Sequence, residues 1–66
     1  MRRGVLKSDL IHSIGHEGTT LEVEYTDKTV FRYEDVPFSV FRKIVTAKSP
    51  GHAWLALREK FSFKKV

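Results

Sequence analysis

The chain has no cysteine among its 66 residues, and this absence excludes disulfide bonds and zinc sites built from thiolates. It also fits a reducing compartment. No uninterrupted hydrophobic run approaches the roughly 20 residues that a transmembrane helix needs. The residues after Met1-Arg2-Arg3 carry charge and form no continuous apolar stretch, which argues against a signal peptide. These absences predict a cytoplasmic protein that does not enter a membrane.

A chain of this length has room for one domain, and such a domain buries only about 60% of its unfolded surface. The formal net charge is +4, which permits an acidic partner such as a nucleic acid without requiring one. Residues 1–7 are basic and show no hydrophobic periodicity. We therefore expect a mobile basic arm over residues 1–7 and a folded domain over residues 8–66.

The clearest secondary-structure signal is an alternation of apolar residues with a period of two, which marks strands with one buried face. It involves Leu21, Val23 and Tyr25, and then Phe31 and Tyr33. It predicts strands over residues 20–25 and 29–35. Residues 8–16 are expected to form a preceding strand with a bulge near Gly15.

The loop between the two clear strands can be deduced from their register. A two-residue loop, Asp27-Lys28, would leave each face of the hairpin half apolar and half charged, which a buried face does not tolerate. A three-residue loop over residues 26–28 gives apolar pairs: Tyr25 with Thr29, Val23 with Phe31, and Leu21 with Tyr33. Such loops place their third residue in the left-handed region, so Lys28 is predicted to have a positive φ.

Helical spacing replaces the alternation after Pro37, a residue that suits the first turn of a helix. The apolar positions of this first helix are Val40, Phe41, Ile44 and Val45. Ser49 and Pro50 are a suitable N-cap and first residue for a second helix. The apolar stripe of that helix is Trp54, Leu57 and Phe61. The tail alternates again at Phe61 and Phe63, which predicts a short fourth strand or an extended strap.

Together these patterns predict an α+β domain, with a three- or four-stranded antiparallel sheet and two helices packed on one of its faces. The order is β-β-β-α-α, followed by the short strand if it forms. We expect the core to consist of Leu21, Val23, Phe31, Tyr33, Phe41, Ile44, Trp54 and Leu57.

Metal and catalytic sites are not indicated. His12 and His16 are four residues apart, which on a strand separates them by about 13 Å, too far for shared ligation. No nucleophile stands in a recognisable elbow, and no glycine-rich phosphate loop is present. The acids Glu22, Glu24 and Glu34 alternate with the apolar residues and are assigned to the solvent face of the sheet, where we expect them to be solvated and to pair across strands with Arg32. We expect no enzymatic activity, no metal and no cofactor.

Basic residues are concentrated in the second half of the chain. The first helix buries its apolar stripe, so Arg42 and Lys43 are expected to face solvent. If the basic residues converge, they form a cationic surface on the helix side of the domain; if they do not, they are ordinary solvated charges. The candidate nucleic-acid-binding residues are Arg42, Lys43, Lys48, Arg58, Lys64 and Lys65.

Several ordered features make residues 8–66 resemble the KTSC domain, a small module named after the C-terminus of some lysyl-tRNA synthetases. They are Ile14-Gly15, Leu21-Glu22-Val23-Glu24-Tyr25, Phe31-Arg32-Tyr33 with Val36-Pro37, Val40-Phe41, Ser49 with Gly51, Arg58, and the aromatic pair Phe61 and Phe63. The resemblance implies a stand-alone protein of a bacterium or phage. RNA binding is implied only through the association with synthetases.

The chain departs from the family pattern at several positions. Phe31 stands where the family has the first tyrosine of a Tyr-x-Tyr, and Phe61 and Phe63 replace a pair of tyrosines. Asp27-Lys28 stands where an Asn-Gly turn is usual.

The function expected from these observations is a small non-enzymatic binding module. The first candidate ligand is RNA or another nucleic acid, bound through the helix-side basic surface. The alternative is a protein-interaction module, such as a phage factor that binds a host protein. Strong salt dependence of RNA binding favours the first candidate, because phosphate contacts release counterions. The sequence does not indicate an oligomeric state.

Overall fold

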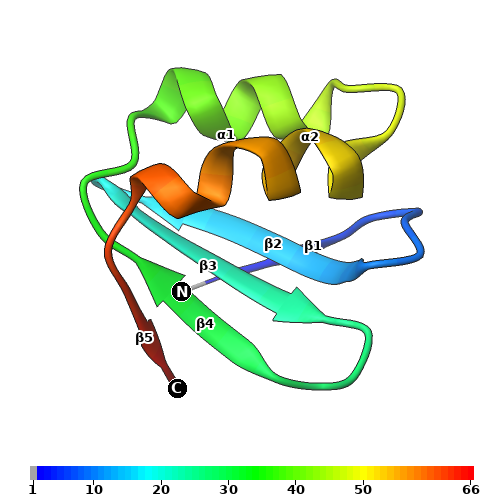
Figure 1. The fold of residues 1–66 in the computed structure, drawn as a ribbon, viewed down its shortest axis with the longest axis horizontal. Helices are drawn as coiled ribbons and strands as arrows, with labels where there is room; N and C mark the ends of the chain where they lie inside the picture. The colour runs from blue at the N-terminus through cyan, green and yellow to red at the C-terminus, as the bar shows by residue number, and fades with distance from the viewer. Residues whose placement is uncertain (1) are drawn as a thin grey trace.

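The computed structural model describes residues 2–66 as an α+β domain in which two helices cover one face of an antiparallel sheet (Figure 1). The elements in chain order are β1 (Gly4–Val5), β2 (Ile11–Glu17), β3 (Thr20–Tyr25), β4 (Val30–Tyr33), α1 (Phe38–Val45), α2 (Pro50–Leu57), the short 3-10 helix η1 (Arg58–Lys60) and β5 (Phe63–Lys65). The predicted fold class is therefore confirmed.

The sheet has five strands in the order β1-β2-β3-β4-β5, two of which come from the ends of the chain. The predicted C-terminal strand is β5, which pairs with β4. The other added strand is β1, where Gly4 pairs with Ile14 and Val5 with Ser13. Residues 4–5 thus belong to the sheet and not to a mobile arm, and Met1 lies outside the described residues. The sequence of residues 4–5 does not by itself predict a strand, because this strand depends on its pairing with β2.

The β3–β4 hairpin has the predicted register, with Val23 opposite Phe31 and Leu21 opposite Tyr33. The Tyr25 amide donates to the Thr29 carbonyl at 2.9 Å and so closes a three-residue loop. Lys28, the third loop residue, has φ 74°. The positive φ follows from the geometry of such loops, in which the chain must turn through the left-handed region before re-entering the sheet.

Gly15 has a different role from the one expected. The irregularity of β2 lies between Ile11 and Ser13 and not at Gly15. Instead, the backbone of Arg2 passes so close to Gly15 that an added Cβ would lie 2.3 Å from the Arg2 carbonyl oxygen. The missing side chain allows the N-terminal segment to cross the open face of the sheet.

The core lies between the helices and the sheet, and five of the eight predicted members are buried there. They are Leu21, Val23, Tyr33, Ile44 and Trp54, joined by Ile11, Ile14 and Val36. Complete burial of such an apolar side chain stabilises the fold by about 1.5–3 kcal/mol. The other three predicted members, Phe31, Phe41 and Leu57, pack against this cluster but keep part of their surface exposed. In so small a domain each helix covers only part of the sheet.

Local sequence accounts for where the helices begin. After β4 the chain turns at Asp35, whose φ of 56° was not anticipated, and Pro37 then precedes α1. Pro50 occupies the first position of α2 as predicted, although the Ser49 side chain makes no capping hydrogen bond. Helix α2 ends at Leu57, so Phe61 reaches its place beside Trp54 from extended chain and not from the helix.

None of the helices formed by residues 2–66 is long and apolar enough to cross a membrane. The longest are α1 and α2, each of eight residues.

Candidate functional site

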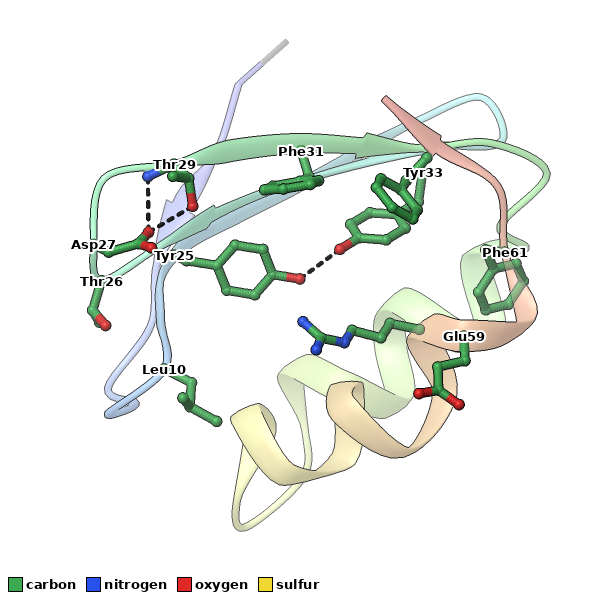
Figure 2. A pocket seen from close by; sticks show the side chains of 11 residues that line it. Leu10, Tyr25, Thr26, Asp27, Thr29, Phe31, Tyr33, Glu59 and Phe61 are labelled. Atoms are coloured by element: carbon green, nitrogen blue, oxygen red, sulfur yellow. Dashed lines mark hydrogen bonds between the residues drawn. The ribbon is translucent and has the colours of Figure 1, made fainter. Parts of the chain in front are cut away.

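A groove of about 700 Å³ opens between the β3–β4 hairpin, η1 and β5 (Figure 2). Its volume falls in the range of small-ligand sites, roughly 300–1,000 Å³. The residues that line it are Leu10, Tyr25, Thr26, Asp27, Thr29, Phe31, Tyr33, Arg58, Glu59, Phe61 and Phe63. Five of these eleven residues are aromatic, and the groove is therefore both apolar and rich in flat rings.

The aromatic rings form one continuous cluster. The Phe31 ring centroid lies 5.7 Å from that of Tyr25, in a T-shaped arrangement, and 5.4 Å from that of Phe63. Phe63 also approaches Tyr33, with ring centroids 5.8 Å apart. The side chain of Phe63 is 58% exposed, an unusual degree for a large hydrophobic residue. The cluster therefore presents an accessible aromatic surface, and Phe31, which was expected in the core, is only partly buried here.

The single tryptophan, Trp54, packs in the core against residues that line the groove. Trp54 is fully buried, and its ring meets Tyr33 edge-on, with centroids 4.7 Å apart. Its indole Nε1 donates to the Tyr25 hydroxyl at 3.0 Å, and the Tyr25 and Tyr33 hydroxyl oxygens lie 2.6 Å apart. Burial, followed by the hydrogen bond with Tyr25, raises the pKa of Tyr33 well above its usual value. Both tyrosine hydroxyls are thus fixed by neighbours inside the groove.

Charged groups border the aromatic cluster on more than one side. Arg58 is adjacent to Tyr25, and a hydrogen bond with that side chain is the first cause of a raised Arg58 pKa. Asp27 stands on the hairpin turn, where hydrogen bonds from the Thr29 side chain and backbone lower its pKa. Glu59 follows Arg58 on η1. The groove therefore combines aromatic rings with one guanidinium and two carboxylates.

The six predicted basic residues do not form one surface. Arg58 lines the groove, and Lys65 lies opposite Phe31 in the sheet, so it shares the helix-covered side. Lys64 lies opposite Arg32 and belongs to the other face of the sheet. The expected helix-side grouping is therefore wrong for Lys64. Strand alternation separates it from its neighbour Lys65.

The remaining three predicted basic residues are exposed but lie away from the groove. Arg42 and Lys43 occupy the last turn of α1, where positive charge favours the helix dipole. Lys48 lies between the helices and borders a second cavity of about 410 Å³, near the start of α2. These residues form a separate cationic region on the helical layer.

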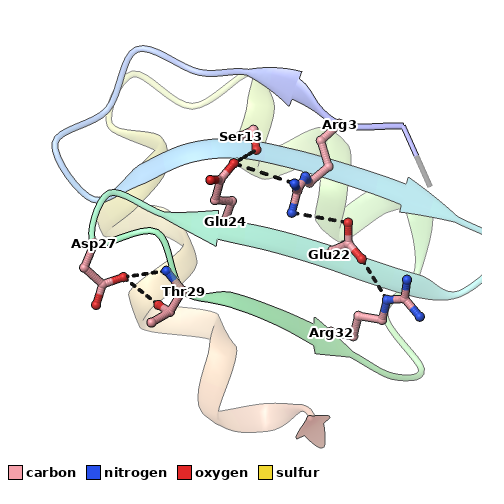
Figure 3. Close-up of polar contacts among 7 residues, drawn as sticks. All are labelled: Arg3, Ser13, Glu22, Glu24, Asp27, Thr29 and Arg32. Carbon is pink, nitrogen blue, oxygen red and sulfur yellow. Dashed lines mark hydrogen bonds and ion pairs between the residues drawn. The ribbon is translucent and has the colours of Figure 1, made fainter. Parts of the chain in front are cut away.

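The open face of the sheet is covered by an ion-pair network (Figure 3), of which the pairing with Arg32 was predicted and the contacts of Arg3 were not. Arg3 lies 3.3 Å from Glu22 and 3.7 Å from Glu24, and Arg32 Nε donates to Glu22 at 2.7 Å. The Ser13 hydroxyl donates to Glu24 at 2.9 Å. As a result Glu22 is only 6% exposed, whereas it was expected to be solvated. These acids hold the N-terminal segment on the sheet.

The two histidines of β2 differ in their surroundings. His16 Nε2 donates to the Val36 carbonyl at 2.7 Å, and its ring stacks on Phe41 with centroids 5.5 Å apart. His12 is exposed on the same strand. Within residues 2–66 there is no group of three histidine, cysteine or acidic residues that could hold a metal ion. That the protein uses no metal remains a prediction.

Sequence reasoning missed the groove itself, although a signal for it was present. Positions that carry the resemblance to the KTSC domain are far apart in the chain but meet here: Tyr25, Phe31, Tyr33, Arg58, Phe61 and Phe63. Each position had been interpreted singly, as core or as surface charge. Their convergence depends on the contact between η1, β5 and the hairpin, which no local pattern encodes.

Comparison with known proteins agrees with this architecture. The structure is similar to the crystal structure of a KTSC domain protein from Yersinia pestis, with a TM-score of 0.93 and 25% sequence identity. The match covers 98% of this chain and 96% of the Yersinia chain. No curated protein sequence matches the chain significantly. The family model of the KTSC domain matches residues 7–56, most of the chain, and the protein therefore belongs to the KTSC domain family.

Proposed function

We propose that this KTSC domain is a non-enzymatic binding module for single-stranded nucleic acid, RNA first, and that bases stack in the aromatic groove. The observation that carries the proposal is the exposed ring of Phe63 beside Phe31, with the Arg58 guanidinium in the same groove. Single-stranded RNA is commonly bound by stacking of unpaired bases on aromatic side chains and on arginine.

The distribution of charge supports a path for the phosphate backbone past the groove. Lys60, Lys64 and Lys65 are exposed on the segment that runs from η1 through β5. Lys60 and Lys65, one on each side of Phe63 in the sequence, can neutralise phosphates while a base occupies the groove, whereas Lys64 lies on the other face of the sheet. We therefore propose that the primary site lies at the β5 edge of the sheet and not on α1. The lack of cysteine is compatible with the reducing cytoplasm, the location proposed for this activity.

The test is a titration of fluorescein-labelled RNA octamers at two salt concentrations, followed by anisotropy. Phe63→Ala should weaken binding by about 1–3 kcal/mol, the usual value of one stacked base. Arg58→Gln should reduce the slope of log affinity against log salt by about 0.7, the contribution of one phosphate contact.

Two control variants locate the site. Phe38 is 60% exposed, close to the 58% of Phe63, but does not line the groove. Phe38→Ala should therefore leave RNA affinity unchanged. Reversal of Arg42 and Lys43 to Glu should weaken binding less than Phe63→Ala. If the reversal is the more damaging change, the site lies on the helical layer. If the wild-type protein shows no salt-dependent binding, the nucleic-acid proposal fails.

A second candidate function, a protein-interaction module, is favoured by the exposure of Phe38 itself. Its ring lies 5.8 Å from those of Phe41 and His16, so the three form an aromatic patch at the start of α1. Exposed aromatic residues are common anchors of protein interfaces. A partner captured from cell lysate independently of salt and nuclease, and lost in Phe38→Ala, would support this second function.

A further inference from the structure

The groove has a polar end at the β3–β4 turn, where the orientation of one carboxylate is fixed. Asp27 Oδ1 accepts two hydrogen bonds from Thr29, from the backbone N–H at 3.0 Å and from the hydroxyl at 2.6 Å (Figures 2 and 3). The second oxygen, Oδ2, has no hydrogen-bond donor among residues 2–66. The carboxylate is therefore held in place with one oxygen still available.

The hydroxyl groups at this end have already used their protons. Thr29 donates its proton to Asp27, and the Thr26 hydroxyl donates to the Asp9 carbonyl at 3.1 Å. An ionised carboxylate only accepts hydrogen bonds, and each hydroxyl has a single proton to donate. This end of the groove thus offers hydrogen-bond acceptors to a ligand. A group bound against Oδ2 must bring a hydrogen-bond donor, such as an amino group, and a carbonyl oxygen placed there would be repelled.

We propose that the groove recognises the exocyclic amino group of a stacked base through Asp27, so that cytosine is bound more tightly than uracil. This inference rests on the proposed function and specifies the ligand of the same groove. Cytosine and uracil share the 2-carbonyl. At position 4 cytosine has an amino donor where uracil has a carbonyl acceptor, and at position 3 cytosine has an acceptor nitrogen where uracil has an N–H donor, so the proposed preference requires that Asp27 meets position 4. Acceptance by Asp or Glu from the 4-amino group is a common way in which proteins read cytosine directly.

Arg58 has a complementary role that does not distinguish the two bases. Its guanidinium only donates, so it can contact a phosphate or the 2-carbonyl, both of which are common to cytosine and uracil. We therefore assign the preference for cytosine over uracil to Asp27. The affinity that is common to both bases is assigned to Arg58 and the aromatic rings.

The experiment compares RNA hexamers of cytidine and of uridine at pH 7.5, with quenching of the single tryptophan as the readout. Trp54 contacts Tyr25 and Tyr33, two residues that line the groove, and so reports its occupancy. The wild-type protein should prefer the cytidine hexamer roughly tenfold, the value of one hydrogen bond to a charged group. A hexamer of pyrimidin-2-one nucleotides, which has neither substituent, should fall between the two.

The informative variant is Asp27→Asn, because the Asn carbonyl can still accept both bonds from Thr29 while its amide nitrogen replaces Oδ2. It should keep the fold, lose the preference for cytidine and gain affinity for uridine. Glu59→Gln is the matched control, because Glu59 also lines the groove but has no hydrogen bond among residues 2–66 that fixes its orientation. It should leave the ratio of affinities unchanged.

Equal affinity of the wild-type protein for the two hexamers, or tighter binding of uridine, overturns the inference but leaves the proposed function intact. The same holds if Asp27→Asn, folded by circular dichroism, retains the wild-type ratio. Failure of both hexamers to bind at low salt overturns the proposed function and this inference together. The two failures are thus distinguishable in one set of titrations.

Discussion

Replacement of Trp54 by alanine is the most severe single change that the structure predicts. The side chain is completely buried, lies edge-on to Tyr33 at 4.7 Å and stacks on Phe61 at 6.0 Å between ring centroids. Its Nε1 also donates to the Tyr25 hydroxyl at 3.0 Å. A change from tryptophan to alanine in a core removes the transfer free energy of the ring and leaves a cavity, at a cost of about 3–5 kcal/mol.

This cost is large relative to the total stability of so small a protein. Globular domains are stable by roughly 0.05–0.15 kcal/mol per residue, which for this chain means about 3–10 kcal/mol. Trp54→Ala should therefore leave a substantial fraction of molecules unfolded at 25 °C. The substitution should also leave a cavity next to the groove, because the indole ring contacts both Tyr25 and Tyr33.

Urea unfolding followed by far-UV circular dichroism measures the effect without relying on the fluorophore that the substitution removes. Trp54→Phe is the matched control: it keeps an aromatic ring, loses the N–H donor and should cost only about 1–3 kcal/mol, the range of an ordinary core substitution. If Trp54→Ala unfolds at the wild-type urea concentration with an unchanged slope, the ring is not a core residue, and our assignment of the helix–sheet interface is wrong.

Three further predictions concern the backbone and pH. Lys28→Gly should raise the free energy of unfolding by up to about 1 kcal/mol in urea titrations, because it relieves a left-handed lysine at φ 74°, and a clear loss of stability would contradict this. Gly15→Ala should lower that free energy by about 1–3 kcal/mol, because its Cβ would lie 2.3 Å from the Arg2 carbonyl oxygen. Gly4→Ala, with no atom within 4 Å of the new Cβ, is the control and should unfold like wild type. Because the pKa of Asp27 is lowered in the folded state, its contribution is present above the ordinary value of 3.8 and is lost as the pH falls through the folded value. Thermal melts between neutral and acidic pH should show this loss in wild type but not in Asp27→Asn, and an identical acid dependence in both would contradict it.

Several features of the fold were predictable from sequence because each depends on residues close together in the chain. The β3–β4 register followed from the requirement that Val23 and Phe31 share a face, and the three-residue loop then required a positive φ at Lys28. The start of α2 at Pro50 followed from the fixed φ of proline. In these cases local sterics and the period of the apolar residues leave one arrangement that buries a continuous face.

The candidate site was only partly predictable, because its residues come from distant segments. Arg58 was predicted from its charge to bind nucleic acid, which stays a prediction, and its place beside Tyr25 depends on how η1 docks against the hairpin. Phe63 was assigned to an apolar pattern, and only the structure shows that no helix covers it. A side chain is buried or exposed according to what packs over it, and a short α2 ends before reaching this part of the sheet.

Sequence alone thus determined the α+β class, the hairpin register, the helix starts and most of the core, since these follow from periodicity and backbone sterics. Tertiary structure decided the strand formed by residues 4–5, the burial of Glu22 beneath Arg3, and the aromatic groove. Each of these depends on a pairing between residues far apart in the chain. The two partners of each contact meet only when the sheet has formed. The sequence around either partner therefore does not predict the contact.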